Sequence, residues 1–288
     1  MNKGWIIYSE QDAYENKAYI NWFIHETKEQ NLDLTLILRE QLQVGLLQNQ
    51  PTILVDHSMV ELPVFAVVRT PEPLLNLLLE EMGIAVFNSS HVARICNHKA
   101  LTHFEVSKLQ IPMVDTLFMK KINLRTTPPM SFPFVVKEAT GRGGKQVFFI
   151  NNQIQWEDCM NQIQSNDVII QTTNVQIGKD IRIFVVGKEI VGAVLRESNS
   201  DFRANYKLGG TATWFELSSN QINMVHKIMN HFDFGMVGID FLIDHDGNLL
   251  FNEIEDVVGS RTLSAVSDLN ILQKYTSYIK SKISGMHS

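Results

Sequence analysis

Three carboxylates near the C-terminal end of the sequence have a spacing that suits a metal site. They are Asp240, Glu253 and Glu255, and each stands close to a short apolar run. Oxygen ligands with no cysteine or histidine among them favour magnesium or manganese. Carboxylates that meet on one face repel one another unless a cation lies among them. The alternative is a solvated acidic edge, the commoner meaning of a single Asp or Glu, but the apolar flanks favour a metal site.

A predicted β-hairpin brings these carboxylates together. The two apolar runs have strand length, and Asp246-Gly247 between them suits a two-residue turn. With that turn Asp240 lies opposite Glu253, and directly opposed residues point to the same face of an antiparallel pair. Glu255 is two residues beyond Glu253, so it points to that face as well.

A glycine-rich segment is the second candidate for chemistry. Its sequence is Gly141-Arg-Gly143-Gly144-Lys145, and it stands between two predicted strands. Three glycines in four residues, beside two basic side chains, let backbone N–H groups approach a phosphate closely. The spacing is not that of a P-loop, and a strand follows where that motif needs a helix. Taken alone, the segment is also compatible with a plain hairpin turn.

The elements that must position these residues begin with alternating strands and helices. Apolar runs predict strands at 5–8, 34–38, 53–55, 64–68 and 84–87, and helical patterns lie at 13–30 and 74–82. Strands that alternate with helices predict a small parallel α/β domain. It has no G-x-G-x-x-G pattern, so nothing in it specifies a dinucleotide.

The remaining two thirds of the chain predict a different arrangement, with hairpins in place of parallel strands. One helix is expected from Ser89 or Ser90 to about residue 110. The later strands and hairpins are expected at 134–137, 146–150, 168–171 and 180–194, the last turning at Gly187-Lys188. The polar stretch 196–210 predicts a loop over a site. Two further helices are expected at about 220–231 and from about 268, with a turn at 259–261 before the second.

Composition limits the function classes. The 288 residues are 44% hydrophobic and 19% charged, which indicates a globular protein. The net charge of -6 argues against broad nucleic-acid binding. No apolar run approaches the ~20 residues that span a bilayer, and the N-terminal run is too short for a signal peptide. Cys96 and Cys159 lack metal-type spacing, so we expect free thiols, a cytoplasmic location and no nucleic-acid or membrane partner.

In this order the elements resemble the ATP-grasp superfamily, most closely its RimK-type branch of ribosomal-protein glutamate ligases and LysX-like amino-group ligases. The matching segments are Phe134–Lys137 with 141–144, Asp180-Ile-Arg182, Asp201-Phe-Arg203-Ala-Asn205, and Gly238-Ile-Asp240 with Glu253-Ile-Glu255. The resemblance covers most of the chain and is weak before residue 84. It implies an α/β (α+β) ATP-grasp fold with a pre-ATP-grasp domain over 1–88, a central small lobe over 89–173 and a C-terminal metal and nucleotide lobe over 174–288.

The resemblance also implies a role for each matching side chain. The residues implied in ATP binding are Lys99, Lys137, Gly141, Gly143, Gly144, Gln171, Thr172, Thr173, Asp180, Arg203 and Asn205. Among these, 171–173 would be the hinge that reads adenine, Asp180 would lie on the ribose side, and Arg203 and Asn205 are the catalytic candidates along the triphosphate. Asp240, Glu253 and Glu255 would bind two Mg²⁺ or Mn²⁺ ions. Arg196 and Arg261 would hold a substrate carboxylate, with plain surface charge as the alternative.

Two positions depart from the family's pattern. Glu255 stands where the family has an Asn that completes the second metal site, which adds a negative charge. The usual Ser-Pro-Gly-type continuation is replaced by Asp256-Val-Val-Gly259. That region borders the acceptor site in the family, so the acceptor of this chain is expected to differ from the usual one.

The implied activity is ATP-dependent formation of an amide bond between a carboxylate and an amine through an acyl-phosphate. The substrate would be an amino acid, a small peptide or a carrier-bound amino group, and a dimer or tetramer would be the usual assembly. One alternative is a phosphotransferase that stops after phosphorylating its substrate. Another is a nucleotide-binding regulatory protein with little turnover, for which Glu255 is the only hint.

Overall fold

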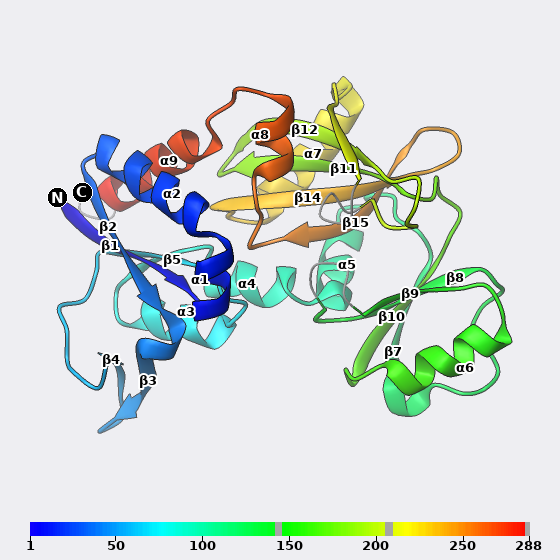
Figure 1. Cartoon of the computed structure of the whole chain (residues 1–288), viewed down its shortest axis with the longest axis horizontal. Helices are drawn as coiled ribbons and strands as arrows, with labels where there is room; N and C mark the ends of the chain where they lie inside the picture. Colours follow the sequence, from blue (N-terminus) through cyan, green and yellow to red (C-terminus); the bar gives the residue numbers. More distant parts are fainter. Residues whose placement is uncertain (142–145, 205–209, 286–288) are drawn as a thin grey trace.

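The computed structural model describes residues 1–141, 146–204 and 210–285. Within these residues the fold consists of four β-sheets with helices between them (Figure 1). The N-terminal sheet lies at one end of the molecule and a small four-stranded sheet lies at the other. The five-stranded sheet that carries the acidic hairpin lies between them along the upper edge of the view.

The N-terminal sheet is parallel, as the alternation of strands and helices predicts. Its order is β2-β1-β5-β6, and its strands are β1 (Asn2–Tyr8), β2 (Leu32–Leu38), β5 (Phe65–Val68) and β6 (Ala85–Phe87). Its helices are α1 (Glu10–Glu15), α2 (Lys17–Glu29) and α3 (Pro73–Glu81). The predicted strand 53–55 does not join this sheet. It belongs to β4 (Gln50–Val55), which pairs with β3 (Leu42–Leu47) in a separate antiparallel hairpin after the short 3₁₀ helix η1 (Arg39–Gln41).

The single helix expected from residue 89 to about 110 is wrong. The chain forms α4 (Ser90–Cys96) and α5 (Lys99–Ser107), with a break at Asn97 and His98. The Asn97 side chain donates to Asp256 Oδ2 (2.8 Å), and His98 has an extended backbone and caps α5. These contacts replace two residues of helix, and they set Lys99 at the first position of α5.

The small antiparallel sheet has the order β7-β10-β8-β9. Its elements are β7 (Thr116–Lys120), η2 (Lys121–Asn123), β8 (Phe134–Glu138), β9 (Val147–Ile150), α6 (Gln153–Gln162) and β10 (Asp167–Thr172). Strand β7 was not predicted. It is an edge strand whose Leu117 and Phe118 remain exposed, so its sequence lacks the alternation of a half-buried strand.

The five-stranded antiparallel sheet has the order β13-β12-β11-β14-β15. Its strands are β11 (Lys179–Val186), β12 (Glu189–Glu197), β13 (Thr211–Trp214), β14 (Met236–Ile243) and β15 (Leu249–Glu255). Val186 pairs with Glu189, which confirms the predicted turn at Gly187-Lys188. The helices of this part are α7 (Ser219–His231), α8 (Arg261–Val266) and α9 (Ile271–Gly285).

The C-terminal helix α9 returns to the N-terminal sheet and packs beside α2 (Figure 1). One core therefore joins Phe23 of α2, Phe184 of β11 and Tyr275 of α9. The small sheet has a core of its own around Trp156 of α6. Of the helices in the described residues, none has both the length and the apolar content to cross a bilayer.

Candidate functional site

The acidic hairpin turns through a wider loop than predicted. Ile243 pairs with Leu249, which leaves Asp244 facing Asn248 and three residues, 245–247, at the tip. The Asp244 carboxylate accepts hydrogen bonds from the backbone N–H groups of Asp246 (2.9 Å) and Asn248 (2.7 Å), and these bonds hold the wider loop. The predicted two-residue turn at Asp246-Gly247 is therefore wrong.

A β-bulge restores the predicted pairing of the two carboxylates. Phe241 pairs with Phe251, whereas Asp240 pairs with Glu253, so Asn252 is the extra residue of β15. The bulge shifts the pairing register of β15 by one residue, which cancels the one-residue shift that the wider loop introduces. Asp240 thus faces Glu253, although the route to that pairing differs from the one that the sequence predicted.

Two guanidinium groups hold the Asp240 carboxylate, which is 1% exposed. Arg182 donates from Nε to Oδ1 (2.7 Å) and from Nη2 to Oδ2 (2.6 Å), and Arg196 adds a bond from Nη2 to Oδ2 (2.8 Å). Burial opposes ionisation of this carboxyl, but the two cations outweigh burial and lower the pKa of Asp240 to about 2. Asp240 is therefore ionised at neutral pH.

The other two carboxylates also face basic side chains. Glu255 forms an ion pair with Nη1 of Arg182, and Glu253 Oε2 lies 3.6 Å from Nζ of Lys99. About a third of each glutamate side chain is exposed, 31% in both cases. In the part of the chain that the structure describes, no three acidic, histidine or cysteine side chains gather closely enough to hold a metal. Basic groups lie where the sequence prediction put a cation.

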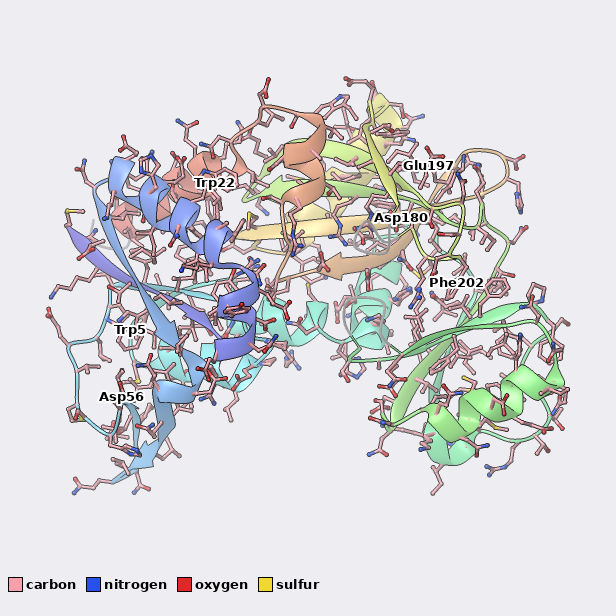
Figure 2. The ribbon with its side chains drawn as sticks, in the orientation of Figure 1. Trp5, Trp22, Asp56, Asp180, Glu197 and Phe202 are labelled. Atoms are coloured by element: carbon pink, nitrogen blue, oxygen red, sulfur yellow. The ribbon has the colours of Figure 1, made fainter. Side chains whose placement is uncertain are left out.

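Asp180 and Arg196 form a second buried pair beside Asp240. Arg196 donates from Nε and Nη2 to the two oxygens of Asp180, at 2.6 and 2.7 Å. Burial is the largest influence on Asp180, and with the nearby charge of Asp240 it raises the pKa of Asp180 to about 6 despite Arg196. Arg196 is 7% exposed, so the surface-charge alternative for it is wrong. Figure 2 places Asp180 on the side of the five-stranded sheet that faces the small sheet.

Two lysines reach the acidic hairpin from the other elements. Lys99 begins α5, and its Nζ donates to the backbone carbonyl of Gly141. Lys137 of β8 donates from Nζ to Oδ1 of Asn252 (2.8 Å). Burial and the charge of Lys99 outweigh the attraction of Glu253 and lower the pKa of Lys137 to about 8. Sequence reasoning missed Asn252, because its role follows from the bulge and no local pattern indicates that bulge.

The predicted adenine hinge lies at the end of β10. Gln171 is buried, and its Nε2 donates to Thr116 Oγ1 and contacts Nε2 of His103, both at 3.0 Å. The Thr172 backbone N–H donates to the carbonyl of Asp115, and the Thr173 hydroxyl donates to that of Pro133. Sequence reasoning also missed His103, whose Nδ1 lies 2.9 Å from the Lys99 carbonyl. Burial, its largest influence, lowers the pKa of His103 to about 4, so the ring is neutral and links the hinge to α5.

The remaining predicted residues fall in three groups. Arg203 is paired with Asp201 (2.7 Å). The intervening Phe202, labelled in Figure 2, packs against Phe149 of β9 with tilted rings whose centroids are 5.3 Å apart. Arg261 is exposed at the start of α8, apart from the buried arginines. Gly143, Gly144 and Asn205 lie outside the described residues.

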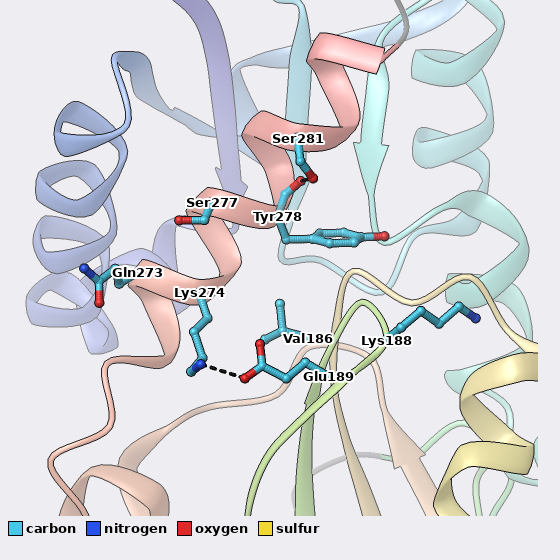
Figure 3. Close-up of a pocket in the computed structure, with 8 residues that line it drawn as sticks. All are labelled: Val186, Lys188, Glu189, Gln273, Lys274, Ser277, Tyr278 and Ser281. Atoms are coloured by element: carbon cyan, nitrogen blue, oxygen red, sulfur yellow. Dashed lines mark hydrogen bonds and ion pairs between the residues drawn. The ribbon is translucent and has the colours of Figure 1, made fainter.

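An open groove between α9 and the β11–β12 turn lies away from these residues (Figure 3). Its lining is Val186, Lys188, Glu189, Gln273, Lys274, Ser277, Tyr278 and Ser281. Lys274 and Glu189 form an ion pair across it (2.6 Å). No carboxylate or base of the acidic site reaches this groove, and we assign the chemistry to the acidic hairpin.

Comparison with known sequences places the site in a family. A model of the RimK-like ATP-grasp domain matches residues 99–279. The chain is 27% identical over 216 residues to a glutamate–LysW ligase of Sulfurisphaera tokodaii, which covers 72% of this chain and 77% of that protein. It is also 27% identical over 262 residues to N-acetylaspartylglutamate synthase A of Homo sapiens, covering 84% of this chain and 66% of that one.

Solved structures share the fold over nearly the whole chain. A RimK domain protein of Sphaerobacter thermophilus has a TM-score of 0.74 at 16% identity, covering 96% of this chain and 98% of the other. The D-Ala:D-Ser ligase VanG of Enterococcus faecalis also has a TM-score of 0.74, at 14% identity, covering 100% and 99%. The chain therefore belongs to the RimK-like ATP-grasp family of ATP-dependent carboxylate–amine ligases.

Proposed function

We propose that this chain activates the carboxylate of a small molecule as an acyl-phosphate and transfers the acyl group to the amine of an amino acid, a peptide or a carrier protein. The observation that carries the proposal is that two acidic residues of the β14–β15 hairpin meet a lysine of α5 and a lysine of β8. These residues are Asp240, Glu253, Lys99 and Lys137. Two lysines suit a triphosphate, and paired carboxylates suit the divalent cations that accompany it.

The acidic side chains fit a divalent cation by their chemistry. Asp240 and Glu253 are directly opposed, and the side chains of Glu253 and Glu255 are partly exposed. In the described residues these side chains do not gather closely enough to hold a metal by themselves, so we propose that they hold Mg²⁺ together with ATP, as two ions in the full site. Bound Mg²⁺ would neutralise developing charge on the phosphate oxygens. Because Arg182 already bonds both oxygens of Asp240, a cation there would compete with that guanidinium.

The basic side chains then act on the substrates directly. Lys99 and Lys137 attract the phosphates of ATP and hold the γ-phosphate toward the substrate carboxylate. A carboxylate oxygen attacks the γ-phosphorus, the bond to the β–γ bridging oxygen breaks, and ADP leaves. The amine then attacks the acyl carbon, phosphate leaves, and the amine loses a proton. We propose Arg203 and Asn205 as the residues that stabilise the transferring phosphoryl group.

The names of the relatives indicate which substrates to try first. The relatives act in the formation of glutamate–LysW, N-acetylaspartylglutamate and β-citrylglutamate. Glutamate is common to all three names. We therefore propose glutamate as the first candidate for one substrate, with N-acetyl-L-aspartate, citrate and peptides as candidates for the other.

The test is ADP release from Mg-ATP with pooled amino acids, N-acetyl-L-aspartate and citrate. We expect ADP only when both a carboxylate and an amine are present. Glu253→Gln should lower the rate by at least about 100-fold, because it removes a ligand charge from a site that works by electrostatic stabilisation. The matched control is Glu189→Gln, whose carboxylate pairs with Lys274 in the groove of Figure 3.

Three outcomes separate the functions. Turnover that needs a carboxylate but no amine would identify a phosphotransferase. ATP binding without turnover on any pool would favour a regulatory protein. Absence of ATP binding would defeat the proposal altogether.

Three further properties belong to this proposal. We propose that 1–88 forms an N-terminal domain, 89–173 a central small lobe and 174–288 a C-terminal lobe around the nucleotide, with the first and the last sharing one core. We propose a cytoplasmic location, which the two buried free thiols of Cys96 and Cys159 support. A dimer or tetramer is proposed from the family resemblance alone.

A further inference from the structure

A second charged site lies at the carboxyl ends of β1 and β5 in the N-terminal sheet. The chain leaves β1 for β2 on one side and later enters β5 on the other side of β1. In open parallel α/β sheets, ligands bind in the crevice outside the strand ends at such a switch in direction. Tyr8 is the last residue of β1, and Arg69 directly follows β5.

Arg69 is a buried cation that takes part in no ion pair within the described residues. The residue is 7% exposed. Its Nε donates to the Tyr8 hydroxyl (3.1 Å) and its Nη2 to the carbonyl of Val258 (2.8 Å). The guanidinium carbon lies 5.8 Å from the ring centroid of Tyr8 and 5.4 Å from that of Tyr19. These partners are neutral, whereas a buried charge is ordinarily paired with an opposite one.

Two buried hydroxyl groups, one on Tyr19 and one on the residue after Arg69, also have unused hydrogen-bonding capacity. The Tyr19 hydroxyl and Thr70 Oγ1 are buried, and neither has a hydrogen-bond partner within the described residues. Tyr19 contributes one of the rings over the guanidinium, and Thr70 is the next residue after Arg69. Buried hydroxyls nearly always have a partner. A buried cation without an acidic partner, packed against a tyrosine whose buried hydroxyl is also unpaired, is the environment that a carboxylate would complete.

Val258 connects this cluster to the acidic site. Its carbonyl accepts from Arg69, and its Cγ2 lies only 2.8 Å from where a Cβ would stand on Gly238. That same position is 3.3 Å from Cδ of Arg182, the residue that holds Asp240. Val258 therefore links Arg69 to Gly238 of β14, the strand that carries Asp240.

We propose that Arg69, with the hydroxyl of Tyr19, binds a carboxylate group of the substrate. The inference rests on the proposed function and names the residues that select an acidic substrate. The alternative is that Arg69 only fastens Val258 to the N-terminal sheet. The two differ in what the Tyr19 hydroxyl does, because that group forms no hydrogen bond with Val258 or any other described residue.

Tyr19→Phe is the most informative variant, since it keeps the ring and removes only the hydroxyl. The probes are L-glutamate, L-aspartate, N-acetyl-L-aspartate and citrate, added to the full chain with Mg²⁺ and the β,γ-imido analogue of ATP. We expect at least one probe to bind, with its Kd raised about 10-fold in Tyr19→Phe. The Tm should stay equal or rise, because the change removes an unpaired buried hydroxyl.

Arg69→Gln should raise the Kd of the same probe by about 100-fold, and Arg94→Gln, an exposed arginine on α4, should leave it unchanged. In turnover, Tyr19→Phe should raise the KM for the carboxylate and leave the KM for ATP unaltered. Failure of every probe to bind wild-type protein, or wild-type affinity in Tyr19→Phe, would overturn the inference. Loss of ATP-analogue binding in the wild-type protein would instead defeat the proposed function.

Discussion

Opposite charges alternate through the acidic site, from Asp180 through Arg196 and Asp240 to Arg182 and Glu255. Each arginine bridges two carboxylates: Arg196 lies between Asp180 and Asp240, and Arg182 lies between Asp240 and Glu255. Removing one member of a buried pair leaves an uncompensated charge and typically lowers the free energy of unfolding by about 3–5 kcal/mol. The Glu in place of the family's Asn is thus accommodated by Arg182, which carries the matching charge.

Asn252 is a positioning residue that should act through Lys137. Asn252→Ala removes the acceptor that fixes Lys137 Nζ, and we expect the KM for ATP to rise about 10-fold. In a Lys137→Met background the same change should have almost no further effect. A double-mutant cycle on ATP affinity measures this coupling. Additive losses would contradict a role through Lys137.

The hairpin β14–β15 works as one element because its turn and its bulge compensate each other. Met236 to Ile243 is almost entirely buried, and Gly238 lets the segment after β15 pass close to β14. Val258 occupies the space where a side chain on Gly238 would lie. The glycine therefore sets the path by which the chain reaches Arg69.

Gly238→Ala tests that close approach. The added methyl group would lie 2.8 Å from Val258 Cγ2, and we expect a loss of about 1–3 kcal/mol in the free energy of unfolding. Ligase activity should fall as well, because Arg182 lies against the same position. Gly259→Ala is the matched control, since nothing lies within 4 Å of its added methyl group. Urea denaturation of both variants gives the comparison, and equal stability of the two would refute the packing argument.

At the scale of the whole molecule, the C-terminal helix α9 closes a core with the N-terminal sheet. Ile279 of α9 and Phe23 of α2 belong to one buried cluster, which also includes residues of β11 and β14. The cluster around Trp156 contains only residues of the small sheet, its helix and the loops that connect them. The N-terminal and five-stranded sheets should therefore unfold together, with the small sheet free to unfold separately.

Single-tryptophan variants can follow each part during urea unfolding. Trp22 reports on the N-terminal part, Trp214 on the five-stranded sheet and Trp156 on the small sheet. In an Ile279→Ala background, which should cost about 2–5 kcal/mol, the Trp22 and Trp214 midpoints should fall together. The Trp156 midpoint should change least. Ile177→Ala, at a side chain 46% exposed, is the control. A fall at Trp22 alone would show that the shared core does not couple the two sheets.

Local sequence patterns determined most of the elements. Short apolar runs with helices between them specified the parallel N-terminal sheet, and Gly187-Lys188 specified a hairpin turn, because side-chain periodicity and turn geometry act over a few residues. The order of the basic, glycine-rich and acidic motifs along the sequence indicated the ATP-grasp family. Asp240 opposite Glu253 was also correct, although the predicted turn was one residue too short.

Only the tertiary structure decided what surrounds those carboxylates. Arg182 and Asp240 are 58 residues apart in the sequence, so the pairing within the acidic site depends on a distant partner. Asn97 and Asp256 are 159 residues apart, and their contact accompanies the helix break before Lys99. No short sequence segment contains both partners of either contact. The bulge at Asn252 and the edge strand β7 depend likewise on neighbouring strands. Arg69 is an ordinary basic residue in the sequence, and it becomes a buried cation without an acidic partner among the described residues only when β1, β5 and Val258 converge on it.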